Sequence, residues 1–222
     1  MADSEVTIWN RALTTAGHRG AISAPLENSR EADLCRLWYD SIRTSILKAA
    51  TWPCATAYSR LALIEERVDG TDWTEGAMAP GWRYAYAMPS DLLAPRYLMN
   101  FARFTRGVWG EQLLLHCNEI TPVLHYTKDQ PSVQLWDTGL SNAVTAALAA
   151  KITQALNGKA GLADKLRNEA IEIIMSARTD MANESEELFD ELPSWIQARG
   201  YTGGASTQRF LWPYQDLSGV PF

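Results

Sequence analysis

The chain has 222 residues, of which 46% are hydrophobic and 21% are charged, and its net charge is −6. This composition excludes a disordered chain and predicts one folded domain, or one domain with an insertion. The acidic balance argues against a protein that neutralises DNA phosphates. Cys35, Cys54 and Cys117 are few and scattered, so we expect a reducing compartment and no disulfide framework.

The opening residues, the apolar runs and the tryptophans indicate where the protein is located and whether it assembles. The opening residues, MADSEVTIWN, contain acids and no basic, apolar leader, so we expect no signal peptide. No apolar run approaches the length of a membrane span, so we expect no membrane contact. Nine tryptophans are many for this length. Because large aromatic rings are enriched in subunit interfaces as well as in cores, the tryptophans favour an assembling chain.

Two helices are predicted in the first fifty residues. The first runs from Glu5 to Ala16, with Ser4 as its N-cap and Gly17 as its stop. The second begins after Asn28 and should stop before Trp52-Pro53, because a residue that precedes proline disfavours helical geometry. Its apolar stripe recurs at steps of three and four residues, namely Cys35, Tyr39, Ile42, Ile46 and Ala49. So wide a stripe needs cover on several sides, which predicts that this helix is the centre of a bundle.

The character of the sequence changes after the second helix. Residues 55–66 have an apolar pattern that favours a helix, with extended structure as the alternative after Arg60. From residue 68 onward glycine and proline mark loops, and bulky residues alternate with smaller ones. Strands are predicted over residues 82–87, 96–104, 111–116 and 123–127. Residues 68–130 therefore read as a small antiparallel β insertion between two helical halves.

Helical periodicity returns after Pro131. One long helix carries apolar residues from Leu135 to Leu156, ends at Asn157-Gly158, and is followed by a second helix from about Lys159. The short link predicts an antiparallel pair. The predicted fold is therefore mainly α. It comprises a helical bundle of residues 1–67 and 131–199, the β insertion of residues 68–130, and an extended C-terminal arm of residues 200–222.

The C-terminal arm is too short to form a core of its own. Its first part, GYTGGASTQ, is flexible in composition, and its second part, RFLWPYQDLSGVPF, is aromatic and apolar. Fully extended, residues 201–222 would span roughly 70 Å. We predict that five residues of the arm bind apolar pockets, namely Phe210, Leu211, Trp212, Tyr214 and Phe222. Those pockets belong either to a neighbouring molecule or to the arm's own bundle.

Reactive constellations are scarce in this sequence. None of the common motifs for phosphate, dinucleotide, zinc-protease or serine-hydrolase sites occurs, so we expect no catalytic residue, metal or cofactor. His116, Cys117 and His125 could converge if their strands pair, and they would bind zinc with a fourth ligand or an open position. Packing on a small sheet is the simpler interpretation of these three residues.

Two groups of charged residues have similarly simple interpretations. The acidic run from Glu184 to Glu191 lacks the spaced Asp/Asn-Gly loop of calcium sites, and we interpret it as a solvated helix face. Arg103 and Arg106 lie among aromatic residues, as in a nucleic-acid patch. So few positive charges in an acidic chain make that patch a poor one.

Several short segments occur in a specific order in the first ninety residues. They are NRALTTAG (10–17) and Ile22; Tyr39, Arg43 and Leu47; Trp52 with Ala55; Arg60-Leu61-Ala62-Leu63; Gly81-Trp82, Tyr84 and Tyr86; and Pro89-Ser90-Asp91-Leu92. In this order and spacing they resemble the head-to-tail adaptors of tailed bacteriophages, the family called tail tubular protein A in short-tailed phages.

That resemblance implies a structural protein and not an enzyme. It implies a ring, commonly of twelve copies, that docks beneath the portal protein at the capsid vertex and receives a tail nozzle or another tail protein on its other face. DNA would pass through the lumen without specific binding, and a negative net charge is compatible with such passage. The implied location is the head–tail junction of the virion, after assembly in the host cytoplasm.

Three alternatives to this reading stay open. The first is a head-completion protein of a long-tailed phage, which would also be helical and would also form a ring. The second is a small metal-dependent enzyme that uses His116, Cys117 and His125. The third is an oligomeric scaffold or regulator with no role in a phage.

Overall fold

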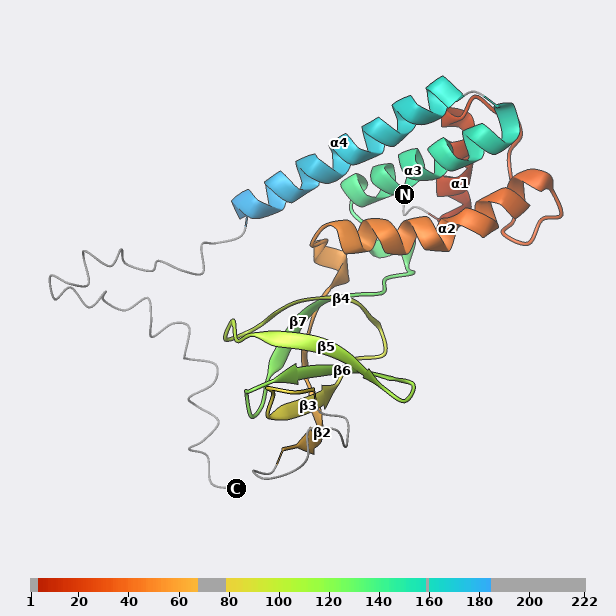
Figure 1. Cartoon of the computed structure of the whole chain (residues 1–222). Coiled ribbons are helices and arrows are strands. Elements are labelled where there is room, and N and C mark those ends of the chain that lie inside the picture. Colours follow the sequence, from red (N-terminus) through yellow and green to blue (C-terminus); the bar gives the residue numbers. More distant parts are fainter. Residues whose placement is uncertain (1–3, 68–78, 159, 185–222) are drawn as a thin grey trace, which may run out of the picture. The chain divides into compact units, whose positions relative to one another are not determined.

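The computed structural model describes residues 4–67, 79–158 and 160–184 of the chain. The contacts of the chain divide it after residue 180, and the packing described below is that of the described residues up to this point. Figure 1 shows the helices and strands in sequence colours. Within the described ranges, no helix combines the length and the apolar character needed to cross a membrane.

The prediction of a mainly α fold is wrong. The structure is 47% helical and 24% strand, with antiparallel sheets of three and four strands beside four helices, which is an α+β fold. The largest error falls on residues 55–66, where the apparent helical pattern gives way to strands β1 (Thr56–Arg60) and β2 (Ala62–Glu66). Pairing with partner strands overrides the weak local preference of such a short run.

The first two helices begin at side-chain caps. Helix α1 (Glu5–Thr15) starts after Ser4, whose hydroxyl accepts from the backbone N–H of Thr7, and the chain leaves the helix through left-handed Gly17. Helix α2 (Arg30–Ala49) starts after Ser29, whose hydroxyl accepts from the N–H of Ala32. The predicted cap of the first helix is confirmed. The cap of the second lies one residue beyond the predicted Asn28.

Helix α3 (Thr138–Asn157), and not α2, occupies the centre of the helical part. Both α1 and α2 pack on it, and its buried side chains include Leu140, Ala143, Val144, Leu148, Ala149 and Ile152. Its many alanines allow neighbouring helices to approach closely from more than one side, whereas α2 buries one stripe. The sequence shows the many alanines of α3, and their close packing, rather than the aromatic stripe of α2, determines which helix is central.

Helix α4 (Ala160–Glu184) runs back in the direction opposite to that of α3 (Figure 1). Gly158 adopts a left-handed φ of 63° between the two helices, as the Asn-Gly signal predicts. Near the other end of α4, Arg178 donates to the carbonyl of Ala49 at the end of α2. The predicted antiparallel pair is therefore confirmed for the described part of α4.

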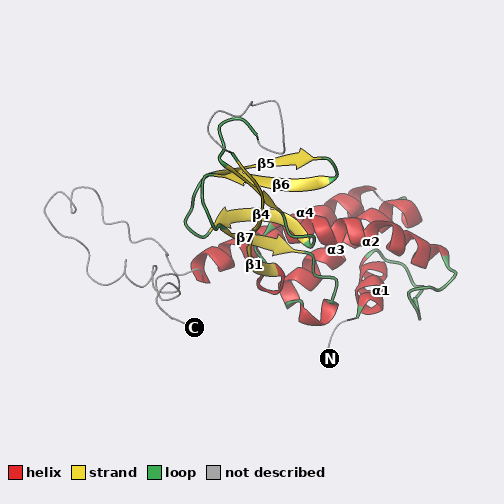
Figure 2. Cartoon of the chain, turned by 90° about the horizontal axis from the view of Figure 1, so that it is seen from below, coloured by secondary structure: helices red, strands yellow, loops and turns green. Residues whose placement is uncertain are grey.

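The strands form two antiparallel sheets (Figure 2). Sheet A has the order β1-β7-β4 and sheet B the order β2-β3-β6-β5. The remaining strands are β3 (Tyr84–Ala87), β4 (Leu92–Leu98), β5 (Phe104–Trp109), β6 (Gln112–Cys117) and β7 (Val123–Lys128). The strand predicted over 96–104 is confirmed only at its ends, because residues 96–98 belong to β4 and residue 104 begins β5, while Phe101, with a φ of 54°, breaks the extended backbone between them.

The two sheets share one apolar core. Sheet A contributes Leu98, Leu124 and Tyr126, and sheet B contributes Tyr84, Tyr86, Leu115 and Cys117. Two short 3-10 turns, η1 (Pro53–Ala55) and η2 (Val133–Leu135), lie where the chain passes between the helical part and the sheets. Trp52 precedes the first turn and is buried, and its indole N–H donates to the carbonyl of Ile46.

Candidate interaction surfaces

The residues predicted to bind a partner lie outside the described residues. These are Phe210, Leu211, Trp212, Tyr214 and Phe222 of the C-terminal arm, and most of the acidic run that begins at Glu184 lies outside them too. Whether the arm binds its own chain or a neighbour therefore stays a prediction.

The three candidate metal ligands do not converge. Cys117 points into the core between the sheets, whereas its neighbour His116 lies on the opposite face of β6, above Gly107. His125 lies on the outer face of sheet A, between the rings of Tyr58 and Tyr97 at centroid distances of 4.8 and 4.4 Å. Within the described ranges, no group of three His, Cys, Asp or Glu side chains is placed to hold a metal ion.

The pKa shifts of His116, Cys117 and His125 also favour a packing role over metal binding or catalysis. Burial lowers the pKa of both His116 and His125, and the charge of Arg96 lowers that of His125 further. Burial raises the pKa of the Cys117 thiol, which makes the nucleophilic thiolate scarce at neutral pH. The buried Nδ1 atoms of the two histidines have no hydrogen-bond partner among the described residues. These side chains behave as packed core and sheet residues.

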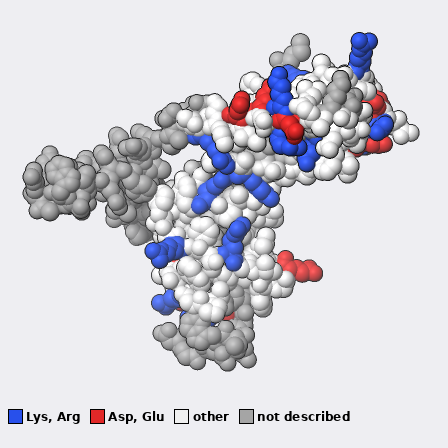
Figure 3. Space-filling model, turned by 45° about the horizontal axis from the view of Figure 1, so that its top comes forward, with Lys and Arg blue, Asp and Glu red and all other residues white. Residues whose placement is uncertain are grey.

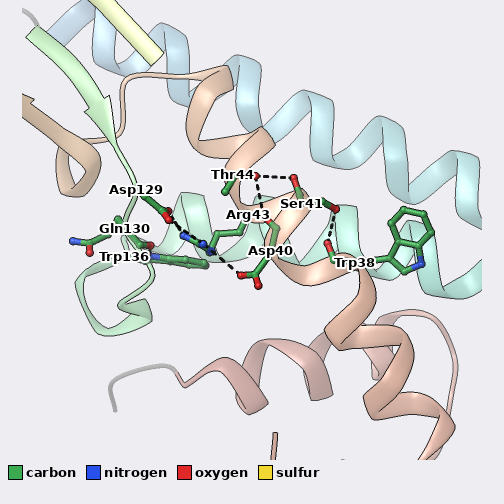
Figure 4. Close-up of polar contacts among 8 residues, drawn as sticks. All are labelled: Trp38, Asp40, Ser41, Arg43, Thr44, Asp129, Gln130 and Trp136. Carbon is green, nitrogen blue, oxygen red and sulfur yellow. Dashed lines mark hydrogen bonds and ion pairs between the residues drawn. The ribbon is translucent and has the colours of Figure 1, made fainter. Parts of the chain in front are cut away.

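An ion pair with a buried arginine and a partly exposed aspartate joins α2 to the segment that leaves β7 (Figure 4). The side chain of Arg43 is only 6% exposed, and its guanidinium pairs with the carboxylate of Asp129 and lies 3.4 Å from that of Asp40. Next in the chain, Gln130 donates to the carbonyl of Cys54, and the indole of Trp136 donates to the carbonyl of Gln130. We call this cluster the Arg43 joint.

A second joint lies at the C-terminal end of α2. Arg96 of β4 donates to the carbonyls of Lys48 (3.1 Å) and Ala50 (2.7 Å), and its Nε donates to the hydroxyl of Thr127. Arg178 of α4 donates to Ala49 at 2.6 Å. Positive groups stabilise the negative end of a helix dipole, so both arginines hold this helix end. The helical part and the sheets are thus tied together at two polar joints.

Exposed apolar side chains gather on the hairpin that joins β5 to β6. Val108, Trp109 and Leu113 are 69%, 51% and 55% exposed, and Val108 is directly opposite Leu113 across the hairpin. Gly110 makes the tight turn with a φ of 59°. Large apolar side chains that are exposed together mark surfaces where proteins meet.

The far edge of the same sheet is also apolar. Leu63 and Ile64 of β2 are 50% and 41% exposed. Sheet B therefore carries exposed apolar residues at both of its outer strands. The sequence contains a signal for the exposed apolar residues of this hairpin, because Val108-Trp109-Gly110 places two large apolar residues in adjacent positions beside a turn, where a half-buried strand would alternate.

Two open grooves lie elsewhere in the described part. One, of about 670 Å³, runs between α1, α3 and α4 and is lined largely by threonine and asparagine side chains. The other, of about 560 Å³, is lined by Trp82, Tyr97, Phe101, Ala102, Arg103, Phe104 and Thr105. Neither brings together groups that would act as acid, base or nucleophile. We regard both as secondary to the edges of sheet B.

Charge is balanced within the described residues. They carry as many lysines and arginines as aspartates and glutamates, so the net charge of −6 arises from the remaining residues. On the face drawn in Figure 3, acidic and basic side chains are interspersed over the helical part. The described residues therefore do not contribute to the negative net charge that is compatible with the passage of DNA.

No protein-family model and no curated protein matches this sequence. The resemblance to phage adaptors therefore rests on the residues quoted for it. The structure gives several of them framework positions: Tyr39, Leu47 and Trp52 are buried, and Arg43 forms a joint. These residues support the fold, while the contacts with partners must come from the surface.

Proposed function

We propose that this protein is a structural adaptor that forms a ring at the head–tail junction of a tailed phage. One face of the ring binds the portal protein, the other face binds a tail nozzle or another tail protein, and DNA passes through the lumen without specific binding. The protein acts without catalysis. The ordered segments of the first ninety residues support this proposal, as do the exposed edges of sheet B.

The exposure of apolar side chains at two different edges of one sheet carries the proposal. A closed ring requires heterologous contacts, in which one surface of a subunit binds a different surface of the next. The β5–β6 hairpin with Val108 and Trp109 supplies one such surface, and β2 with Leu63 and Ile64 supplies the other. A subunit with a single self-complementary patch would favour a dimer instead.

The copy number, the partners and the location come from the resemblance. We take the ring as one of twelve subunits in the virion, with the C-terminal arm of residues 200–222 clamping a neighbour or the portal. The joints at Arg43 and at the end of α2 support this role, because they hold the helices and the sheets as one body that a ring wall can use.

Sedimentation velocity tests the proposal. The full-length protein is run alone and mixed with the portal protein encoded in the same genome, and the assembled fractions are imaged by negative stain. We expect rings, either free or formed on the portal. A chain that stays monomeric in both samples, with no portal in its fractions, contradicts the adaptor function.

A further inference from the structure

The two outer strands of sheet B are suited to pair with each other across a subunit boundary. The four strands alternate in direction in the order β2-β3-β6-β5, and among the described residues no strand pairs with the outer edge of β2 or of β5. A second copy, displaced sideways by rotation about an axis parallel to the strands, would bring its β2 next to β5. The two strands would then be antiparallel, which continues the alternation of the sheet.

The charges of the two edges are complementary. Arg106 of β5 and Arg103 just before it are exposed, and neither forms an ion pair with a described residue. Strand β2 ends in Glu65 and Glu66. Glu66 pairs with Arg83 at 3.3 Å, and the two side chains are 45% and 63% exposed. Because exposed ion pairs contribute little free energy, Glu66 can exchange Arg83 for another arginine at little cost.

One register matches both the charges and the faces of the two strands. Leu63 and Glu66 are opposite Tyr86 and Tyr84 of β3, so they lie on the face of sheet B that turns toward the core. Arg106 and Val108 are opposite Leu115 and Leu113 of β6, on the same face.

Strand β2 has a bulge between Leu63 and Glu65. With Ile64 left as the extra residue, antiparallel pairing sets Glu66 opposite Arg106 and Leu63 opposite Val108. A parallel pairing that keeps Leu63 beside Val108 and again leaves out Ile64 would set Glu66 beside Gly110, past the end of β5, and Arg106 beside Leu61, so the two charges would not meet.

We propose that β5 of one subunit pairs with β2 of the next, so that sheet B continues from subunit to subunit around the ring. This inference rests on the proposed function, because it requires that the subunits form a closed ring. Main-chain hydrogen bonds supply the attraction, as in other strand additions, and the pair of Arg106 with Glu66 fixes the register. The contact is heterologous, which is the type of contact that forms a ring when the rotation between neighbouring subunits closes.

Charge reversal with rescue is the first test. Full-length Arg106→Glu, Glu66→Arg and the double variant are compared by sedimentation velocity under the conditions in which the wild type forms rings. We expect each single variant to reduce the ring fraction at least about tenfold and the double variant to restore it. The matched control is Arg60→Glu, which reverses an exposed arginine on the edge strand β1 of sheet A and should leave the ring fraction unchanged.

Disulfide trapping is the second test and does not depend on weakening the ring. Directly opposed residues of antiparallel strands lie close enough for a disulfide. Oxidation of full-length protein with Leu63→Cys and Val108→Cys should therefore give a covalent ladder of multimers. The matched control, Tyr58→Cys with Val108→Cys, places one cysteine on sheet A and should give no ladder.

The outcomes separate this inference from the proposed function. Rings or portal complexes that form normally with Arg106→Glu, and that give no ladder from the cysteine pair, overturn the edge pairing and leave the adaptor function standing. A wild-type chain that neither forms rings nor binds the portal overturns both. Circular dichroism of each variant confirms folding, which is expected because every substituted residue is exposed.

Discussion

The helical part and the sheets of this protein differ in where their apolar side chains are exposed. Helix α3 buries residues on several sides beneath α1 and α2, and Trp9, Leu13 and Leu47 are almost fully buried around it. Sheet B has a comparable core but leaves Leu63, Val108 and Trp109 half exposed at its two edges. Helix α3 is therefore enclosed by the other helices, although Leu37 of α2 and Met175 of α4 are exposed, whereas sheet B ends in backbone edges that another chain can cover.

This difference separates the residues that hold the fold from those that bind partners. Substitutions in the helical part and at its joints should lower the free energy of unfolding. Substitutions at the edges of sheet B should change assembly and leave the free energy of unfolding nearly unchanged. The predictions below test this division, from the largest expected change in stability to the smallest.

The largest effect is expected at the Arg43 joint. Asp129→Ala leaves the buried guanidinium of Arg43 without its close carboxylate partner, so we expect a loss of about 3 kcal/mol in the free energy of unfolding. Urea denaturation measures it. Arg36→Ala, which breaks an exposed pair with Asp33, is the control and should cost less than about 1 kcal/mol. Equal losses would show that the Arg43 joint has no special role.

A smaller effect is expected at Gly107. A Cβ atom at this position would lie 2.4 Å from Nε2 of His116, so Gly107→Ala must displace a buried ring. We expect a loss of about 1–3 kcal/mol in thermal or urea unfolding. Gly161→Ala is the matched control, because its Cβ would meet open space in α4. It should stabilise the protein by up to about 1 kcal/mol, and a loss there would contradict the packing argument.

Acid should weaken the sheets through the two buried histidines. Burial lowers the pKa of His116 and His125 below the ordinary value of 6.5. As the pH falls below 6.5, the unfolded chain therefore binds more protons than the folded chain does. Stability should therefore fall from pH 6.5 downward, by at most about 1.4 kcal/mol per histidine and pH unit, until the folded pKa is reached. Urea midpoints between pH 5 and 7.5 measure this decline. His125→Gln should flatten it, and an unchanged slope would exclude His125 as a cause.

The smallest effect on stability is expected at the edge of sheet B. Val108 is 69% exposed, so Val108→Ser should change the free energy of unfolding by less than about 0.5 kcal/mol. The same variant should lower the fraction of protein in rings. Met175→Ser, at a residue that is 59% exposed on α4, is the control and should change neither quantity. An equal loss of rings with Met175→Ser would place part of the interface on α4.

The sequence predicted the helices better than the sheets, for a physical reason. Caps and stops such as Ser4, Gly17 and Gly158 act locally, so a short stretch of sequence contains the whole signal. Strands β1 and β2 depend on partner strands that are distant in the chain. Because these two strands were not predicted, the predicted fold class contained too little strand.

The candidate surface was harder to predict than the fold. Prediction placed the contacts in the arm, from Phe210 to Phe222, because its aromatic residues lie outside any helical or strand pattern. The edges of sheet B were missed because exposure at β2 and β5 follows from strand order, and strand order is fixed by pairings such as Tyr84 with Cys117 that no local pattern encodes.

Hydrogen–deuterium exchange of the full-length protein, free and in rings, tests the central claim most directly. The edges of sheet B should gain protection on assembly, at residues 62–66 and 104–109, because their outer backbone groups become hydrogen-bonded to a neighbour. Helices α2 and α3 should exchange equally in both states. New protection in these helices, with none at the two edges, would contradict the division between a self-contained helical part and an assembling sheet.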